Sequence, residues 1–199
     1  MKIGCIVLAA GKSTRFGKED KLLQPLGGSP LLLCTLSALP VNLFEAFCVV
    51  TSSDSVSKLC ADHGYSCVKY SGGLLSDSIR EGLKAMPEGL DGFLFVNGDR
   101  PFLTTTTIKH ILASFVKNPE CVIRLYSGEN PSNPVMFPVS AKDALFSLRG
   151  DQGGSRLIKS GKYGMIPVQA ASESEVFDID DQSTLAQANR ILQSISVKE

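Results

Sequence analysis

The sequence has no tryptophan, only two histidines and no excess of charge of either sign. Its 20 lysine and arginine residues balance its 20 aspartate and glutamate residues in a chain of 199 residues. A protein that covers a long stretch of nucleic acid needs a basic excess, so the composition argues against that class. One small anionic ligand needs only a local basic cluster. The two histidines, His63 and His110, fall in or beside expected helices, and we assign neither a catalytic role.

Paired cysteines and uninterrupted apolar runs are also missing. None of the six cysteines belongs to a Cys-x-x-Cys pair, which argues against a zinc ribbon or a thioredoxin-type motif. Most have apolar neighbours, so we expect core thiols in a reduced, cytoplasmic protein. The uncharged segment 22–44 is broken by three prolines and two glycines, so it does not predict a membrane span. The apolar start, residues 1–10, is short for a signal peptide and predicts a buried strand.

What is present is an alternation of short apolar runs with amphipathic segments. This alternation predicts an α/β fold in which helices cover both faces of a mostly parallel, doubly wound sheet, giving three layers. We expect one domain spanning residues 1–199. The expected strands are 2–9, 44–51, 65–70, 92–96, 121–126, 135–137, 163–168 and 176–179. The expected helices are 30–39, 53–62, 76–85, 104–116, 141–148, 154–159 and 183–195.

Polar clusters follow four of these strands, after Ala9, Tyr70, Val96 and Ile179. In open parallel sheets, ligands bind beyond the carboxyl ends of the strands. We therefore expect the four clusters to meet at one edge of the sheet and to form a binding site there.

The first cluster, residues 8–23, reads LAAGKSTRFGKEDKLL. It is not a P-loop, because that motif needs a glycine where this chain has Ile6. Small residues let backbone N–H groups approach an anion, and four basic side chains accompany two acidic ones. On the residues alone, a triphosphate site and a solvated basic loop fit equally well. The basic residues are Lys12, Arg15, Lys18 and Lys21.

This stretch resembles the opening signature of the molybdenum cofactor cytidylyltransferases, part of a wider family of nucleotidyltransferases that activate sugars, polyols and molybdopterin. The resemblance implies a Rossmann-like nucleotidyltransferase fold, as in nucleotide-diphospho-sugar transferases. It implies that Arg15 and Lys21 hold a triphosphate and are catalytic. It also implies that the main chain of Ala9, Ala10 and Gly11 approaches the base and the phosphates. The paired alanines resemble the CTP-using members more than the GTP-using ones, which typically read L-A-G-G.

The second cluster, residues 71–83, begins an expected helix and reads SGGLLSDSIREGL. Ser76 near its start predicts an N-cap, although the free N–H groups of a helix start can also bind a ligand. On spacing alone, the capping role is favoured. The segment is similar to the base-reading stretch of the cytidylyltransferases, which implies that Gly73 and Ser78 contact cytosine. Arg80 would orient the helix.

Two acidic segments predict a Mg²⁺ site. Asp99 follows a buried strand and precedes Pro101, and Mg²⁺ prefers one or two carboxylates together with phosphate oxygens and water. The segment 176–181 reads VFDIDD, and period-two alternation places Asp178 and Asp180 on one side. The resemblance assigns the second metal ligand to this segment, and we choose Asp180. Turn and capping roles for these acids are the alternative.

The acceptor side is assigned by resemblance, with one departure. The family usually reads Gly-Asp-Gln-Pro where this chain has Arg100 in place of the glutamine, so the acceptor contact of that glutamine cannot be carried over. Two later segments, SNPVMF and GDQGGSRLI, resemble the pterin side, where Asn133 would bind a pterin and Arg156 a phosphate or a neighbouring carboxylate. A small extra residue precedes Arg156, and a flexible turn at 150–154 fits equally well. Asp181 is expected to cap the last helix.

The resemblance implies an enzyme, a Mg²⁺-dependent nucleotidyltransferase that moves CMP from CTP to the phosphate of molybdopterin or molybdenum cofactor and releases pyrophosphate. A molybdenum hydroxylase apo-enzyme is the expected recipient of the product, and neither nucleic acid nor membrane is an expected partner. Three alternatives stay open: a guanylyltransferase or a sugar- or polyol-phosphate nucleotidyltransferase, a nucleotide-binding module that delivers a cofactor without turnover, and a glycosyltransferase. Glycosyltransferases usually carry Asp-x-Asp at an internal strand end, whereas here it lies near the C-terminus.

Overall fold

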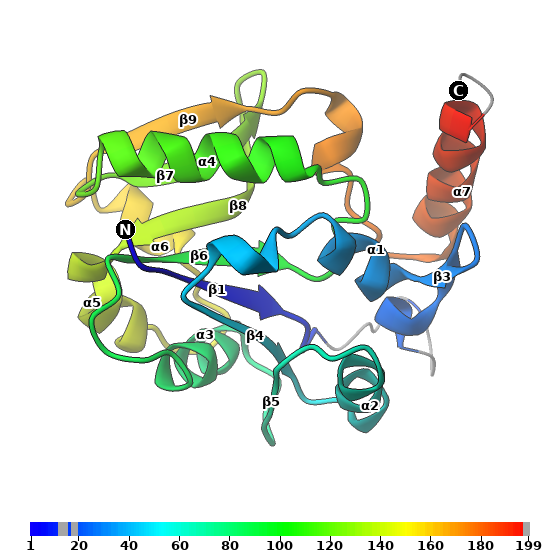
Figure 1. Cartoon of the computed structure of the whole chain (residues 1–199), viewed down its shortest axis with the longest axis horizontal. Coiled ribbons are helices and arrows are strands. Elements are labelled where there is room, and N and C mark those ends of the chain that lie inside the picture. Colours follow the sequence, from blue (N-terminus) through cyan, green and yellow to red (C-terminus); the bar gives the residue numbers. More distant parts are fainter. Residues whose placement is uncertain (12–15, 17–19, 197–199) are drawn as a thin grey trace.

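The computed structural model describes residues 1–11, 16 and 20–196. Its centre is a seven-stranded sheet with the strand order β5-β4-β1-β6-β8-β7-β9 (Figure 1). A two-stranded ribbon, β2 with β3, lies outside this sheet. The strands are β1 (Ile3–Leu8), β2 (Pro25–Leu26), β3 (Ser29–Pro30), β4 (Ala46–Thr51), β5 (Cys67–Lys69), β6 (Gly92–Asn97), β7 (Val122–Ser127), β8 (Asn130–Pro138) and β9 (Met165–Gln169).

The sheet is parallel except at β8. β1 pairs in parallel with β4 and β6, β4 with β5, and β7 with β9, whereas β8 runs antiparallel to both β6 and β7. The chain reverses between β7 and β8 at Gly128 and Glu129, and Gly128 has a φ of 59°, which glycine adopts without steric cost. The predicted mostly parallel sheet is therefore confirmed.

Helices cover both faces of the sheet, so the predicted three-layer α/β fold is confirmed. On one face α1 (Leu31–Ser37), α2 (Asp54–Asp62) and α4 (Thr105–Lys117) pack over the inward side chains of Cys5 and Val7. On the other face α3 (Leu75–Lys84), α5 (Lys142–Phe146) and α6 (Ser155–Lys159) pack with Ile6. Within the described residues, no helix combines the length and the apolar character that crossing a bilayer requires.

Three helices begin at side-chain caps that hold their first free N–H groups. Ser53 accepts from the Val56 N–H in α2, and Thr104 accepts from the Thr107 N–H in α4. Asp181 accepts from the Thr184 N–H at 2.8 Å and caps α7 (Gln182–Ser196), as predicted.

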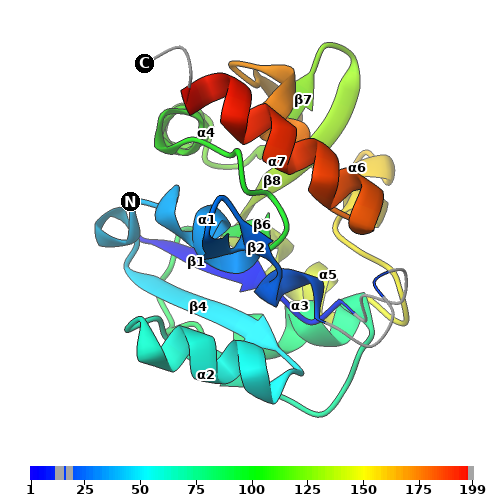
Figure 2. The same cartoon turned by 90° about the vertical axis from the view of Figure 1, so that its right-hand side faces the viewer.

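The last helix lies at the end of the molecule to which β1 points (Figure 1). There α7 is joined to the β2–β3 ribbon, because the Gly27 N–H donates to Asn189 Oδ1 at 3.2 Å. Figure 2 shows this end of the molecule, with α7 and the ribbon on the viewer's side. The edge where a ligand would bind is therefore bordered by these two elements.

Candidate nucleotide and metal site

β1 and β6 end side by side, and the segments that follow them leave the sheet at the same edge. Leu8 and Asn97 are partners at the end of the ladder, and the Gly98 N–H donates to the Leu8 carbonyl at 2.9 Å. The buried hydroxyl of Thr35 donates to the Gly98 carbonyl at 2.9 Å. These bonds fix the backbone that presents Asp99. The expected meeting of the segments after β1 and β6 is therefore present.

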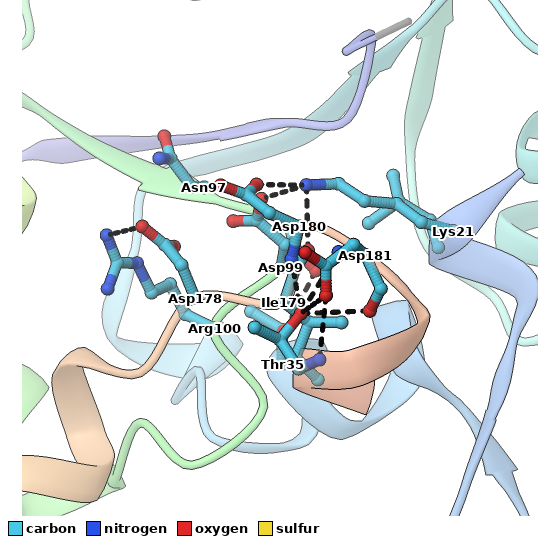
Figure 3. Close-up of polar contacts among 12 residues, drawn as sticks. Lys21, Thr35, Asn97, Asp99, Arg100, Asp178, Ile179, Asp180 and Asp181 are labelled. Atoms are coloured by element: carbon cyan, nitrogen blue, oxygen red, sulfur yellow. Dashed lines mark hydrogen bonds and ion pairs between the residues drawn. The ribbon is translucent and has the colours of Figure 1, made fainter. Parts of the chain in front are cut away.

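Lys21 lies between two carboxylates that come from distant parts of the chain (Figure 3). It is the first residue of the short 3-10 helix η2 (Lys21–Leu23). Its Nζ donates to Asp99 Oδ2 at 2.6 Å, to Asp180 Oδ1 at 3.2 Å and to the Ile179 carbonyl at 2.9 Å. Burial favours a lower pKa for Lys21, but attraction to Asp99 and hydrogen bonds to both carboxylates outweigh it and raise the pKa. The ammonium therefore stays charged at neutral pH.

The pair of Asp99 and Asp180 fits a divalent cation. Asp99 Oδ1 is buried without a hydrogen-bond partner in the described part of the chain, and the ammonium of Lys21 stands in for a cation between the two carboxylates. Residues 1–11, 16 and 20–196 contain no group of three or more His, Cys, Asp or Glu that could hold a metal. The protein would thus supply two carboxylates, and substrate phosphates and water the other ligands, as Mg²⁺ prefers.

The segment that carries Asp178 and Asp180 is not a strand, so the predicted strand 176–179 is wrong. It consists of a 3-10 helix, η5 (Glu173–Val176), followed by irregular chain. The buried carboxylate of Glu175 accepts hydrogen bonds from the hydroxyls of Thr104 and Thr107 and from a backbone N–H. These bonds hold the segment against the start of α4.

Asp178 and Asp180 pair with different basic side chains, Arg100 and Lys21, although the period-two pattern predicted that they lie on one side. Asp178 Oδ2 accepts from Arg100 Nη2 at 2.8 Å (Figure 3). Burial raises the pKa of Asp178 to about 6, the Arg100 charge opposes this shift, and the carboxylates of Asp99 and Asp180 add to it. Arg100 thus anchors this acidic segment beside Asp99.

A cavity of about 430 Å³ opens beside Lys21 and Asp99. Small-molecule sites usually enclose about 300–1,000 Å³, so the cavity is of suitable size. Its lining also includes Asn97 and Asp151, which the sequence analysis did not assign. The structure brings seven of the predicted residues together in this lining: Ala9, Ala10, Gly11, Lys21, Gly73, Ser78 and Asp99. Their individual roles stay predictions.

The helix that borders this cavity does not begin as predicted. Ser76 is not the N-cap of α3, because the helix begins one residue earlier and the hydroxyl of Ser76 is buried without a partner among the described residues. Ser78 lines the cavity, and its Oγ lies 2.7 Å from the Tyr70 hydroxyl. Arg80 donates to Asp77 and to the Leu148 carbonyl, so it ties α3 to its neighbour, as its expected orienting role requires.

A second cavity, of about 240 Å³, shares Asn97 and two other lining residues with the first. Asn133 lines it, as predicted for the acceptor side, whereas Arg156 is exposed on α6 and does not. The amide of Asn133 is engaged by the backbone of β6, since Oδ1 accepts from the Asn97 N–H at 2.7 Å and Nδ2 donates to the Phe95 carbonyl. Asn133 therefore also fixes the junction of β6 and β8.

Two arginines that the sequence analysis did not assign to a ligand supply the charge of the second cavity. Arg100 and Arg124 both line it. Arg124 interrupts the apolar run of β7, and a charged residue inside a buried strand is the signal that could have identified it. The predicted triphosphate ligand Arg15 lies outside the described residues, as do Lys12 and Lys18.

Comparisons with known proteins bear on this arrangement. A sequence profile of the MobA-like NTP transferase domain matches residues 5–166. The "Probable molybdenum cofactor guanylyltransferase" of Pyrococcus horikoshii is 34% identical over 134 residues, which are 64% of this chain and 65% of that protein. The "Purine catabolism protein PucB" of Bacillus subtilis is 28% identical over 197 residues, covering 88% of this chain and 90% of that protein.

Rv0371c from Mycobacterium tuberculosis H37Rv, solved in complex with manganese, has the same fold. It matches with a TM-score of 0.78 and 22% sequence identity over 96% of this chain and 99% of that chain. The sequence profile covers most of the chain, from β1 to the start of β9. The chain therefore belongs to the family of MobA-like NTP transferase domains and is a nucleotidyltransferase.

Proposed function

We propose that this enzyme transfers CMP from CTP to the phosphate of molybdopterin or the molybdenum cofactor, with Mg²⁺, and releases pyrophosphate. The observation that carries the proposal is the meeting of Lys21, Asp99 and Asp180 beside the first cavity. An ammonium and two carboxylates at one point can serve a bound triphosphate and its cation together. The second cavity provides adjacent space for an acceptor.

The reaction would be an in-line displacement. An oxygen of the acceptor phosphate attacks the α-phosphorus of CTP, a new P–O bond forms, and the bond to the β-phosphate oxygen breaks so that pyrophosphate leaves. The acceptor phosphate is already anionic near neutral pH, so no general base is required. Catalysis would then depend on positioning and on stabilisation of charge.

The residues divide these tasks. Asp99 and Asp180 would hold Mg²⁺, which when bound neutralises phosphate charge and assists the leaving group. Lys21 would donate hydrogen bonds to the triphosphate from its compact ammonium group. Arg15 is expected to share that role through its planar guanidinium group, which can form paired hydrogen bonds. The backbone after β1 would cradle the phosphates through small residues. A divalent ion is also supported by the manganese complex of the structurally similar Rv0371c.

CTP is the expected nucleotide because Ala9 and Ala10 give the motif of the CTP-using members that the sequence resembles. Gly73 and Ser78 line the first cavity, and the hydroxyl of Ser78 offers a small polar group to a pyrimidine edge. A guanylyltransferase is the second candidate, because the Pyrococcus horikoshii relative at 34% identity carries that name. The shift in melting temperature with CTP and with GTP, each with Mg²⁺, separates the two candidates, since a ligand stabilises the form that binds it.

The direct test is pyrophosphate release from purified protein, Mg²⁺, each nucleoside triphosphate and a molybdopterin acceptor. We expect release with CTP, and Asp99→Asn should lower it about 100-fold or more, as expected when an electrostatic contact to the transition state is lost. Asp62→Asn is the matched control, because Asp62 pairs with Lys58 on the surface. Release with GTP alone would favour the guanylyltransferase, and tight CTP binding without any release would favour a delivery module.

The proposal also assigns a location and a recipient. All six cysteines are free thiols, which a reducing compartment such as the cytoplasm favours. The product would pass to a molybdenum hydroxylase apo-enzyme. Failure of the tagged enzyme to retain such an apo-enzyme under product-forming conditions would count against this recipient.

A further inference from the structure

The second cavity combines an apolar floor with two guanidinium groups. Phe95 and Phe137 belong to its lining and meet edge to face, with ring centroids 6.0 Å apart and planes at 78°. Arg100 and Arg124 are its charged side chains, and no lining residue in the described part of the chain is acidic. Such a lining suits a ligand with an apolar, planar body and an anionic end.

Arg100 has a hydrogen-bond donor that the protein does not use. Its side chain is largely buried, with 7% exposed, while Nη2 binds Asp178 and Nη1 binds the Val176 carbonyl. The Nε is buried and has no partner among the residues that the structure describes. A buried donor without an acceptor is unfavourable, because the loss of its hydration is not compensated. A ligand oxygen in the cavity would supply the missing acceptor.

Arg124 lies on the same face of the sheet as the floor of the cavity. Val135 of β8 is paired with Phe95 of β6 on one side and with Arg124 of β7 on the other, and directly paired residues share a face. Arg124 Nε donates to the Ser132 carbonyl at 2.9 Å, which fixes the plane of the guanidinium. Its terminal nitrogens have no hydrogen bond to the described residues. Their charge is therefore available to a ligand.

From these contacts we propose that the second cavity is the acceptor subsite, and that Arg100 and Arg124 select an acceptor with a phosphate monoester on an apolar body. This inference rests on the proposed function, because it takes the ligand beside the nucleotide cavity to be the acceptor. Two guanidinium groups match the charge of a dianionic phosphate: Arg124 offers its terminal nitrogens, and Arg100 offers its unused Nε. The two cavities share Leu8, Leu75 and Asn97, so a phosphate bound in the second cavity lies beside the cavity that Asp99 lines.

Direct binding tests this inference without turnover. Naphthyl phosphate carries a dianion on an apolar ring, and naphthol carries the ring alone. We expect calorimetry to show that the protein binds naphthyl phosphate about tenfold or more tightly than naphthol, because hydrogen bonds between charged groups contribute that much. Arg100→Gln and Arg124→Gln should each remove about tenfold of this affinity. Arg190→Gln changes an exposed arginine on α7 and should leave it unaltered.

Arg100→Gln removes the partner of Asp178, so the folding of this variant has to be checked. Each variant is therefore required to retain CTP binding. Arg124→Gln leaves Asp178 paired and provides an independent test. Equal affinity for naphthyl phosphate and naphthol would overturn the inference. So would phosphate binding that survives both substitutions or that is lost only in Arg156→Gln. Pyrophosphate assays separate this result from the proposed function: both variants should raise the KM for the acceptor and not for CTP. If the unaltered enzyme released no pyrophosphate, only the proposed function would be contradicted. The comparison of naphthyl phosphate with naphthol would still test the phosphate subsite.

Discussion

The ammonium of Lys21 lies 2.6 Å from a carboxylate oxygen of Asp99, and the same ammonium lies 3.2 Å from Asp180. Without a cation between them, the two carboxylates would repel each other. If Asp99 and Asp180 are the metal ligands that we propose, Lys21 lies where the divalent ion would bind, and Lys21 is also the expected triphosphate contact. In the free protein Lys21 neutralises the two carboxylates. When a nucleotide binds with its metal ion, the ion would take over this role, and Lys21 would then pair with the phosphates.

Replacing Lys21 should make the free protein respond more strongly to a divalent cation. In Lys21→Met the carboxylates of Asp99 and Asp180 lose their shared ammonium, so added Mn²⁺ without nucleotide should raise the melting temperature more than in the unaltered protein. CTP binding should weaken in the same variant. Lys58→Met removes a lysine from a surface pair and is the control. A Mn²⁺ response that does not grow would argue against the two carboxylates as a cation site.

Packing beneath the site can be tested at Gly82, where α3 approaches β1. A Cβ at this position would lie 2.5 Å from the Cγ2 atom of Ile6. Alanine favours a helix over glycine by about 1 kcal/mol, whereas overpacking a core costs about 1–3 kcal/mol. We expect Gly82→Ala to lower the free energy of unfolding by about 1 kcal/mol net in urea titrations. Lys84→Ala, exposed on the same helix, should change it by less than about 0.5 kcal/mol. A stabilised Gly82→Ala would show that Ile6 can move aside.

The strands that position the site could be predicted because each is buried on both faces. The runs 3–8 and 92–97 lack polar alternation, which is typical of central parallel strands. Parallel neighbours end at one edge, so the approach of Asp99 to the segment after β1 followed from the fold class. Fold class places the basic loop at this edge, but it does not distinguish Lys21 from the other basic residues of the loop. The resemblance to the cytidylyltransferases identifies Lys21, together with Arg15.

Other features of the site depend on contacts between residues far apart in the sequence, which no local sequence pattern predicts. The stretch VFDID alternates as a strand does, but Glu175 binds Thr107, 68 residues away, and this contact decides the path of the chain. Arg100 and Asp178 are 78 residues apart in the sequence, and each alone is an ordinary charged residue. The charge of the second cavity was missed for the same reason, because its arginines come from two separate strand regions.

The buried carboxylate of Glu175 should therefore be necessary for the acidic segment to take this path. Glu175→Ala leaves the hydroxyls of Thr104 and Thr107 without their acceptor, so we expect the free energy of unfolding to fall by about 3 kcal/mol in urea titrations. The affinity for CTP with Mg²⁺ should also fall, because Asp180 would no longer be held in place. Glu173→Ala, at an exposed position of the same 3-10 helix, is the control. Equal stability of the two variants would contradict this account.

Among Cys48, Cys60 and Cys67, the half-buried thiol of Cys67 should be the most reactive near neutral pH. A hydrogen bond with Cys60 lowers the pKa of Cys67 to about 7, burial opposes this shift, and a hydrogen bond with Ser57 adds to it. Burial raises the pKa of Cys48 to about 12. The lowered pKa of Cys67 favours the folded state above the ordinary value of 9.0, and this contribution is lost as the pH falls through about 7. The raised pKa of its partner Cys60 opposes this contribution at high pH. Iodoacetamide labelling followed by peptide mass spectrometry should give a midpoint near this pH. Ser57→Ala should raise the midpoint and the exposed Ser55→Ala should not; a midpoint near 9.0 in the unaltered protein would contradict the assigned hydrogen bonds.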